Sequence, residues 1–347
     1  MKSRRHPICM HRRLPHWKAG LLSILVWRDV LLLLAGVAFA AATSHAPAVA
    51  VPSGGECRMR AGTFETLTVP SQMGPIEVQV QWARHCGARA LYLLDGLRAR
   101  LDTNGWSDQT AARALFAEDN ITLVMPAGGP GSWYADWSAP TVENGRTVTY
   151  RWETFLTQEL PAYLASYGVS PTGNGIVGLS MSASSALTLT AGHRDQFISA
   201  AAFSGLLDWH TPDLREAVRT ITWQAGHNPD SLAAPGHPRW NDLDPYLNAP
   251  QLAGVALYIA SGPGLPFPGE FDSLSSVPTA VGAMSLEAGT ALATRQFKTR
   301  LDSLGITATY SFPAAGAHTW RNWDAELTRA RPVLLDALLG PDPTGRP

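Results

Sequence analysis

Short, mostly apolar runs separated by turn signals occupy the middle of the chain and predict the strands of a buried sheet. Runs that are apolar at consecutive positions are typical of parallel strands covered on both faces. Asp95-Gly96 and Pro126 close the first two runs, as strand ends require. The runs lie at residues 90–94, 121–125, 175–179, 200–203, 255–260 and 307–312.

Several segments between these runs show the periodicity of helices. From Tyr150 to Tyr167, large apolar residues recur at steps of three and four. Residues Ser182–Ala191 and Gln296–Leu304 are also predicted helices. Strands that alternate with helices indicate an α/β fold, with a doubly wound, mostly parallel sheet and helices on both faces.

Two strand-like stretches precede these runs and predict an antiparallel hairpin at one edge of the sheet. They are Thr63–Val69 and Ile76–Trp82, joined by a turn at Ser71–Gly74. Cys57 and Cys86 flank the hairpin, and a pairing centred between Ser71 and Gln72 brings them close together. In an exported protein they would form a disulfide; the alternative is two unpaired thiols.

The first 50 residues have the order of a secretory signal peptide. A basic head is followed by an apolar run at 30–42 and by small residues at Ala48–Ala50. The run is shorter than the roughly 20 residues that a membrane-spanning helix needs. We therefore expect residues 1–50 to direct export to the outside of the cell or to the cell wall. The alternative is an uncleaved membrane anchor.

The rest of the chain is expected to form one domain, residues 51–340, followed by a flexible tail at 341–347. Residues 205–250 contain Pro, His and Trp but little strand signal. They are predicted to form a lid-like insertion over the carboxyl edge of the sheet, where folds of this class place their sites.

Composition and charge exclude some functions. The chain is 45% hydrophobic and 16% charged, which is typical of a globular protein. Residues 1–50 hold seven basic side chains and one acid, a net charge of +6, so the remainder carries −7 of the total of −1. An acidic body argues against nucleic-acid binding.

The segment Gly178–Ser182, sequence GLSMS, lies between a buried strand and a helix of small residues. This is the setting of a nucleophile elbow, in which a sharp turn exposes the hydroxyl of Ser180. A structural turn without chemistry is the alternative. A nucleophilic serine needs a base within hydrogen-bond reach.

His318 fits the position of that base, because it follows the last predicted strand and a Pro-Ala-Ala-Gly loop. Five other histidines lie outside the leader and are alternatives. They are His85, His193, His210, His227 and His237.

The third member of such a triad is an acid located between the serine and the histidine in the chain. Composition and spacing do not choose among six candidates. They are Asp208, Asp242, Asp244, Glu270, Asp272 and Glu287.

Several motifs in order along residues 65–338 carry a family resemblance. They include Tyr92–Ala99 (YLLDGLRA), Trp133–Trp137 (WYADW), Gly178–Met181 (GLSM) and Gly316–Trp320 (GAHTW). With these motifs the chain strongly resembles the mycolyltransferases of the antigen 85 type, which are esterase-D-like α/β-hydrolases.

The resemblance implies which residues complete the site. A Leu-Glu-Ala-Gly segment at the family's spacing before the histidine implies that Glu287 is the acid. Backbone N–H groups of Leu97 and Met181 are implied as the oxyanion hole. Side chains implied to bind the sugar are Asp95, Arg98 and Trp320.

The resemblance also implies the reaction. A mycolyl group would move from trehalose monomycolate to a sugar hydroxyl, of a second trehalose monomycolate or of cell-wall arabinan, through an acyl-enzyme on Ser180. No metal or cofactor is needed. Peripheral contact with the cell envelope is implied, and host matrix binding is allowed. The alternatives are a secreted carboxylesterase and a non-catalytic cell-wall- or matrix-binding member of the family.

Four features affect specificity. Arg215–Trp240 is expected to line a lipid channel, with Val218, Ile221 and Trp223 as its apolar wall. Departures from the family pattern are Ser182 in place of Ala, Arg100 in place of Gln, and Ser261 in place of Cys.

Overall fold

The computed structural model describes residues 59–271 and 277–340 of the chain. All of them fall within one compact unit. The predicted leader at 1–50, Cys57, Asp272 and the tail at 341–347 lie outside the described residues. The predicted division into leader, domain and tail therefore stays a prediction.

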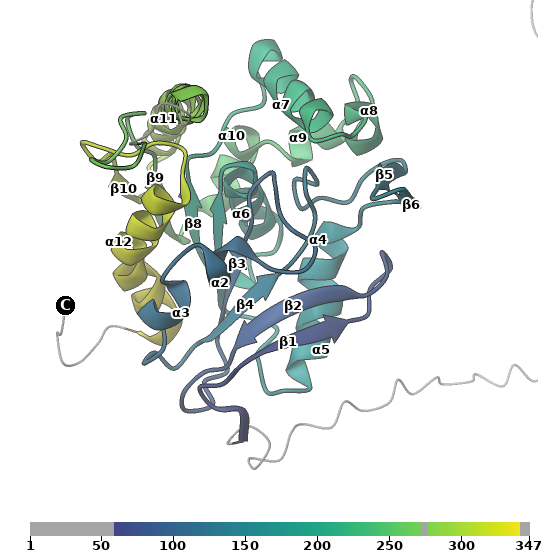
Figure 1. Cartoon of the computed structure of the whole chain (residues 1–347), viewed down its shortest axis with the longest axis vertical. Helices are drawn as coiled ribbons and strands as arrows, with labels where there is room; N and C mark the ends of the chain where they lie inside the picture. The colour runs from purple at the N-terminus through teal and green to yellow at the C-terminus, as the bar shows by residue number, and fades with distance from the viewer. Residues whose placement is uncertain (1–58, 272–276, 341–347) are drawn as a thin grey trace, which may run out of the picture. The chain divides into compact units, whose positions relative to one another are not determined.

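Within these residues an eight-stranded sheet forms the centre of the fold (Figure 1). Its strand order is β1-β2-β4-β3-β7-β8-β9-β10. Pairs from β4 to β10 run parallel, whereas β2 is antiparallel to both β1 and β4. The predicted α/β fold with an N-terminal hairpin is confirmed. The strands are β1 Phe64–Val69, β2 Ile76–Gln81, β3 Ala90–Leu94, β4 Thr122–Pro126, β7 Asn174–Leu179, β8 Phe197–Phe203, β9 Ala256–Ala260 and β10 Thr309–Ser311.

Helices cover both faces of this sheet. Alternate residues of β3 belong to different core clusters, because successive side chains of a strand point to opposite faces. Tyr92 and Leu94 pack in the cluster that includes side chains of α5, α6 and α11, whereas Leu91 and Leu93 pack with α12. The longer helices of the described chain are α6 Met181–Gly192, α7 Pro212–Gln224, α11 Val277–Ser303 and α12 Trp320–Leu339.

Short elements make up the remainder. The predicted helix at 150–167 is a succession of three pieces, α4, η1 and α5, with a π-helical middle. None of the described helices is long and apolar enough to span a membrane. The short elements are α2 Gly105–Asp108, α3 Ala112–Leu115, β5 Thr141–Glu143, β6 Arg146–Val148, α4 Trp152–Thr154, η1 Phe155–Glu159, α5 Leu160–Ala165, α8 Pro229–Leu232, α9 Arg239–Asp242, α10 Pro245–Asn248 and η2 Ala249–Leu252.

The hairpin forms as predicted but in a different register. Val69 pairs with Ile76, so the ladder is centred between Gln72 and Met73 and not between Ser71 and Gln72. The turn explains the shift, because the Ser71 hydroxyl donates to Gly74 O at 2.5 Å and accepts from the Met73 amide at 3.1 Å. Cys86 is disulfide-bonded. Its predicted partner, Cys57, lies outside the described residues, so that pairing remains a prediction.

Candidate active site

Ser180 lies at a sharp turn between β7 and α6. Its φ is 53°, in the left-handed region that a non-glycine residue adopts only when its surroundings hold it there. Gly178 permits the turn, since a Cβ at that position would lie 2.0 Å from Ser182 O. The Ser180 amide donates to Phe203 O at 2.8 Å, which anchors the turn to the end of β8. This geometry is that of a nucleophile elbow.

Ser182, one of the departures from the family pattern, supports this turn. Its side chain is fully buried. The hydroxyl accepts a hydrogen bond from the Leu179 amide at 2.9 Å and lies 3.0 Å from Leu94 O, to which it donates. The Ser182 hydroxyl, which an alanine would lack, therefore connects the elbow by a hydrogen bond to the end of the neighbouring strand β3.

The structure brings Ser180, His318 and Glu287 into one hydrogen-bonded relay. His318 Nε2 lies 2.8 Å from Ser180 Oγ, and His318 Nδ1 lies 2.8 Å from Glu287 Oε2. The His318 side chain is 7% exposed and that of Glu287 is 0% exposed. One ring nitrogen can accept the serine proton while the other donates to the carboxylate, as nucleophilic catalysis requires.

Four donors hold the other oxygen of Glu287. Oε1 accepts from the Gly262 amide at 2.6 Å, Ser204 Oγ at 2.8 Å, Ser261 Oγ at 3.2 Å and Asn322 Nδ2 at 3.2 Å. Hydrogen bonds to the charged form of a buried carboxyl offset its loss of water. The carboxylate is therefore fixed in the orientation that presents Oε2 to His318.

Sequence reasoning missed most of these supporting residues. Ser204 has a φ of 54° at the end of β8, one strand away from the similarly strained Ser180. Its hydroxyl also accepts from the Trp323 indole at 3.1 Å, and the Trp323 ring packs edge-on against His318 at 5.0 Å. A serine that follows a strand carries no signal of its own in the sequence.

The other candidate acids and bases lie elsewhere. Glu270 accepts from Thr319 Oγ1 and from the Phe267 amide, and Asp208 pairs with His210. His193 contacts Glu153, and His227 contacts Thr141. None of these side chains has a hydrogen bond to Ser180 or His318 among the residues the structure describes.

Asp95 lies at the carboxyl end of β3 and is 4% exposed. Its Oδ2 accepts from the Gly105 amide at 2.8 Å, and Oδ1 accepts from its neighbour Gly96 at 3.3 Å. Burial raises the pKa of the Asp95 carboxyl to about 6, against the lowering effect of these two amides. Both a neutral and a charged carboxyl are therefore accessible near neutral pH.

The two other predicted sugar-binding side chains differ in their surroundings. Arg98 is exposed and makes no ion pair with Asp95 among the described residues. Trp320 begins α12 and packs edge-on against Trp106 at 5.5 Å. A Cβ at Gly105 would lie 2.2 Å from the Trp320 ring, so this indole stands directly beside the backbone that holds Asp95.

The two predicted oxyanion donors are free to serve a ligand. Met181 is the first residue of α6, and the first N–H groups of a helix have no intrahelical acceptor. Across residues 59–271 and 277–340, the Leu97 amide donates no hydrogen bond. Leu97 O accepts from the Gly131 amide at 3.0 Å, which fixes the orientation of this loop.

The residues predicted to form a lipid channel have mixed exposure. Within α7, Val218 is fully buried, Ile221 is half-buried and Trp223 is 69% exposed. The Thr222 hydroxyl accepts from the Trp133 indole at 2.8 Å, which joins α7 to the domain. Of the three predicted wall residues, Val218 therefore packs in the core, Ile221 packs against it, and Trp223 is largely exposed.

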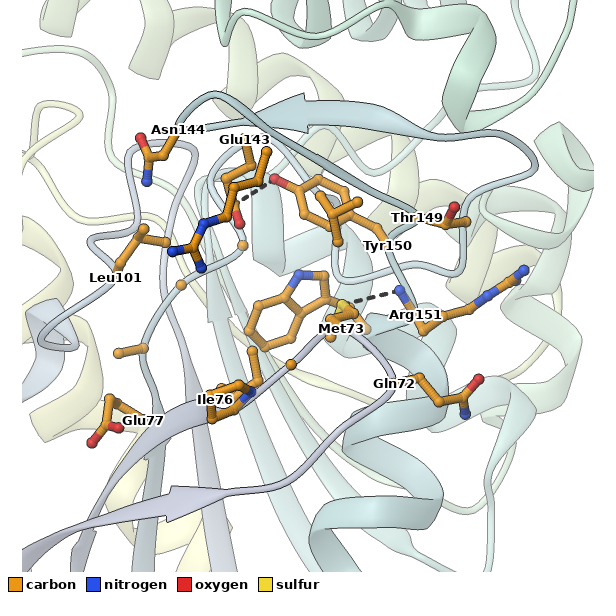
Figure 2. Close-up of a pocket in the computed structure, with 18 of the residues that line it drawn as sticks. Gln72, Met73, Ile76, Glu77, Leu101, Glu143, Asn144, Thr149, Tyr150 and Arg151 are labelled. Carbon is orange, nitrogen blue, oxygen red and sulfur yellow. Dashed lines mark hydrogen bonds between the residues drawn. The ribbon is translucent and has the colours of Figure 1, made fainter.

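A separate cavity of about 730 Å³ is lined by none of the relay residues (Figure 2). It is formed by the β1–β2 turn, the β5–β6 hairpin and the loop after β4. Tyr150 donates to Glu143 at 2.6 Å on one side of it. Leu101 connects it to the loop that carries Arg98. Neither Ser180 nor His318 lines it.

Comparison with known proteins decides the family. The esterase family model, described as "Putative esterase", matches residues 71–334. Diacylglycerol acyltransferase/mycolyltransferase Ag85C of Mycobacterium avium is 36% identical, over 91% of this chain and 87% of that protein. The Ag85B protein of Mycobacterium leprae is 38% identical, over 79% and 84%. The chain belongs to the antigen 85 mycolyltransferase family.

Solved structures agree with this family. MPT51 (FbpC1) of Mycobacterium tuberculosis matches with a TM-score of 0.67 at 28% identity, over 80% of this chain and 99% of that one. The fluorophosphonate-binding serine hydrolase FphF of Staphylococcus aureus matches with a TM-score of 0.56 at 15% identity, over 77% and 96%, and shows the shared fold alone.

Within the antigen 85 mycolyltransferase family, the two remaining departures have local explanations. Ser261, expected as Cys, donates to Glu287 and so belongs to the support of the acid. Arg100, expected as Gln, forms an ion pair with Asp102 at 2.9 Å and lies 3.7 Å from Asp108. The added charge is therefore neutralised within its own loop.

Proposed function

We propose that this protein is a serine acyltransferase that moves a mycolyl or similar long acyl group from trehalose monomycolate to a sugar hydroxyl. The observation that carries the proposal is the Ser180–His318–Glu287 relay, with 2.8 Å at each step. The relatives named mycolyltransferases supply the substrate class.

The first half of the reaction forms an acyl-enzyme. His318 Nε2 takes the proton of Ser180 as its oxygen attacks the ester carbonyl, and Glu287 stabilises the imidazolium. The N–H groups of Leu97 and Met181 stabilise the oxyanion of the tetrahedral intermediate, an effect typically worth about 3–4 kcal/mol per donor. The intermediate then expels trehalose, whose oxygen receives the proton from His318.

The second half transfers the acyl group to an acceptor. His318 removes the proton of an acceptor hydroxyl, which attacks the Ser180 ester; collapse of the second intermediate returns the proton to the serine. Asp95, Arg98 and Trp320 bind the sugar, since a carboxyl, a guanidinium and an indole suit a polyhydroxylated ring. Acceptors are trehalose monomycolate and cell-wall arabinan.

The protein acts outside the cell, at the envelope. Residues 1–50 direct export, and the Cys57–Cys86 disulfide is compatible with an oxidising compartment. Residues 205–250 form a lid that contacts the acyl chain, through Ile221 on α7. Bulky polar substitution at Ile221 is expected to reduce turnover of long-chain esters and to spare short-chain ones. Equal losses on both would contradict the lid assignment.

Mass spectrometry of the protein after incubation with trehalose monomycolate tests the reaction. We expect a mass gain of one acyl chain on the Ser180 peptide, absent in Ser180→Ala. Added trehalose should discharge the acyl-enzyme faster than water does. If trehalose has no effect, the protein is a carboxylesterase; if a fluorophosphonate also fails to label Ser180, it is a non-catalytic binding protein.

A further inference from the structure

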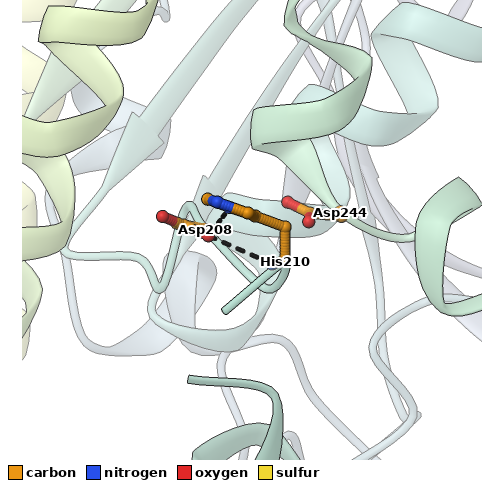
Figure 3. A group of neighbouring side chains, drawn as sticks. All are labelled: Asp208, His210 and Asp244. Atoms are coloured by element: carbon orange, nitrogen blue, oxygen red, sulfur yellow. Dashed lines mark hydrogen bonds and ion pairs between the residues drawn. The ribbon is translucent and has the colours of Figure 1, made fainter. Parts of the chain in front are cut away.

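A cluster of three side chains that can bind a metal ion lies apart from the relay. Asp208 and His210 belong to the loop between β8 and α7, and Asp244 precedes α10. Each offers one ligand atom, and the three atoms lie within 4.8 Å of one another. The two carboxylates flank the His210 side chain (Figure 3). None of the three side chains contacts Ser180, His318 or Glu287 in the described chain.

Asp244 contains a buried oxygen that has no partner. Its side chain is 0% exposed. Oδ1 accepts from the Trp209 amide at 3.1 Å and from the Tyr246 amide at 2.9 Å, whereas Oδ2 has no hydrogen-bond partner among the described residues. A buried unsatisfied carboxylate oxygen is costly.

The protein itself does not neutralise this pair of acids. Asp208, which is 4% exposed, pairs with His210 Nδ1 at 2.6 Å. No lysine or arginine of the described chain forms an ion pair with Asp208 or Asp244. Two buried carboxylates next to one imidazole therefore leave an excess of negative charge, which a cation would balance.

We propose that Asp208, His210 and Asp244 bind a divalent transition-metal cation, with Zn²⁺ as the best match. Imidazole together with carboxylate oxygens suits zinc and its neighbours, whereas calcium takes six to eight oxygen ligands. His210 is on the exposed side of the cluster, so water can complete a tetrahedral coordination. Stacking on Tyr246, with ring centroids 4.5 Å apart, orients the imidazole.

The position of the cluster gives the cation a structural role. Asp208 and His210 precede the α7–α9 segment (residues 211–243), and Asp244 follows it. A cation held by all three joins the two ends of this segment and restricts its movement. The relay uses none of these ligands, so the proposal does not rest on the proposed acyl transfer.

Isothermal titration of ZnCl₂ into the full chain, freed of metal by chelation, tests this proposal. We expect one strong site and a higher Tm with zinc. His210→Ala and Asp244→Asn should each weaken binding at least roughly tenfold, because even the loss of a group that only supports a ligand typically costs about 10–100-fold in metal affinity. Asp242→Asn, an exposed acid two residues before Asp244, is the matched control and should bind as the wild type does.

Two outcomes would overturn the proposal. One is a wild-type chain that shows no strong site. The other is equal zinc affinity in His210→Ala and the wild type, since His210 is exposed and its substitution should not disturb folding. Replacing zinc by Co²⁺ adds a spectroscopic measurement: visible bands of a tetrahedral site should appear in the wild type and disappear in Asp244→Asn.

Discussion

Replacing Glu287 by Gln tests the relay at its most constrained position. Glutamine has nearly the same shape but only one acceptor oxygen, whereas both oxygens of Glu287 accept hydrogen bonds. Oε1 accepts from four donors and Oε2 from His318 Nδ1. In either orientation the amide NH₂ of glutamine therefore replaces an oxygen that accepts a hydrogen bond in the wild type.

The two orientations predict the size of the loss. With the amide nitrogen facing His318, the ring must carry its proton on Nε2 and can no longer accept one from Ser180. With the oxygen facing His318, the NH₂ group meets four donors in a site that is 0% exposed. The wrong tautomer in a serine protease triad costs about 10⁴-fold in kcat, equivalent to about 5 kcal/mol.

Two measurements check this prediction. We expect hydrolysis of a short-chain p-nitrophenyl ester and the rate of fluorophosphonate labelling to fall together by about 10³–10⁴-fold. Glu326→Gln is the matched control, because Glu326 is equally buried but contacts Tyr258 and Arg329, outside the relay. A folded Glu287→Gln protein that keeps its rate within about threefold would refute the reasoning.

Two more substitutions probe stability. A pKa raised from 3.8 to about 6 means that Asp95 stabilises the fold fully below pH 3.8 and loses this contribution as the pH rises past about 6. Asp95→Asn also loses one acceptor for the Gly96 and Gly105 amides, at every pH, so the pH dependence is the informative quantity: the effect of the substitution on the free energy of unfolding should be more favourable at pH 8 than at pH 4, by up to about 3 kcal/mol; equal effects in urea titrations at both would contradict it. Ser182→Ala leaves the Leu179 amide unpaired and should lower the Tm by about 2–6 °C. An unchanged melting curve would show that this hydroxyl is dispensable.

The strands were the most predictable part of the fold. Parallel strands buried on both faces are continuous apolar runs, and β3 and β4 lie within a residue of their predicted bounds. The hairpin register was wrong, because a turn of four residues does not reveal which of its positions pair. There a side-chain hydrogen bond of Ser71 decides, and this depends on the folded geometry.

Two long helices were largely missed. Only the last part of α11 was predicted, as Gln296–Leu304. The part before Gln296 exposes Val281, Leu286 and Leu292 and contains Gly282 and Gly289, so its apolar pattern is weak. The helix α12 was not predicted, and it contains Pro332, a residue that usually marks a helix boundary.

Site residues were predictable from the sequence only where the neighbouring residues form a recognisable pattern. The elbow at Ser180 has a strand–turn–helix pattern that sequence can reveal. Glu287 lies within a long helix, so nothing in its neighbours distinguished it from five other acids, and only family resemblance selected it. The role of Ser204 depends on contacts between segments distant in the chain, which no local pattern contains.

The approach of Asp208 to Asp244 has an evolutionary consequence. The two ends of the α7–α9 segment lie close together, since the Trp209 amide donates directly to Asp244. Such a segment can be lengthened, shortened or exchanged between relatives without moving any strand end. On the lid function proposed above, replacement of this one module would change the surface offered to the acyl chain and leave the relay unaltered.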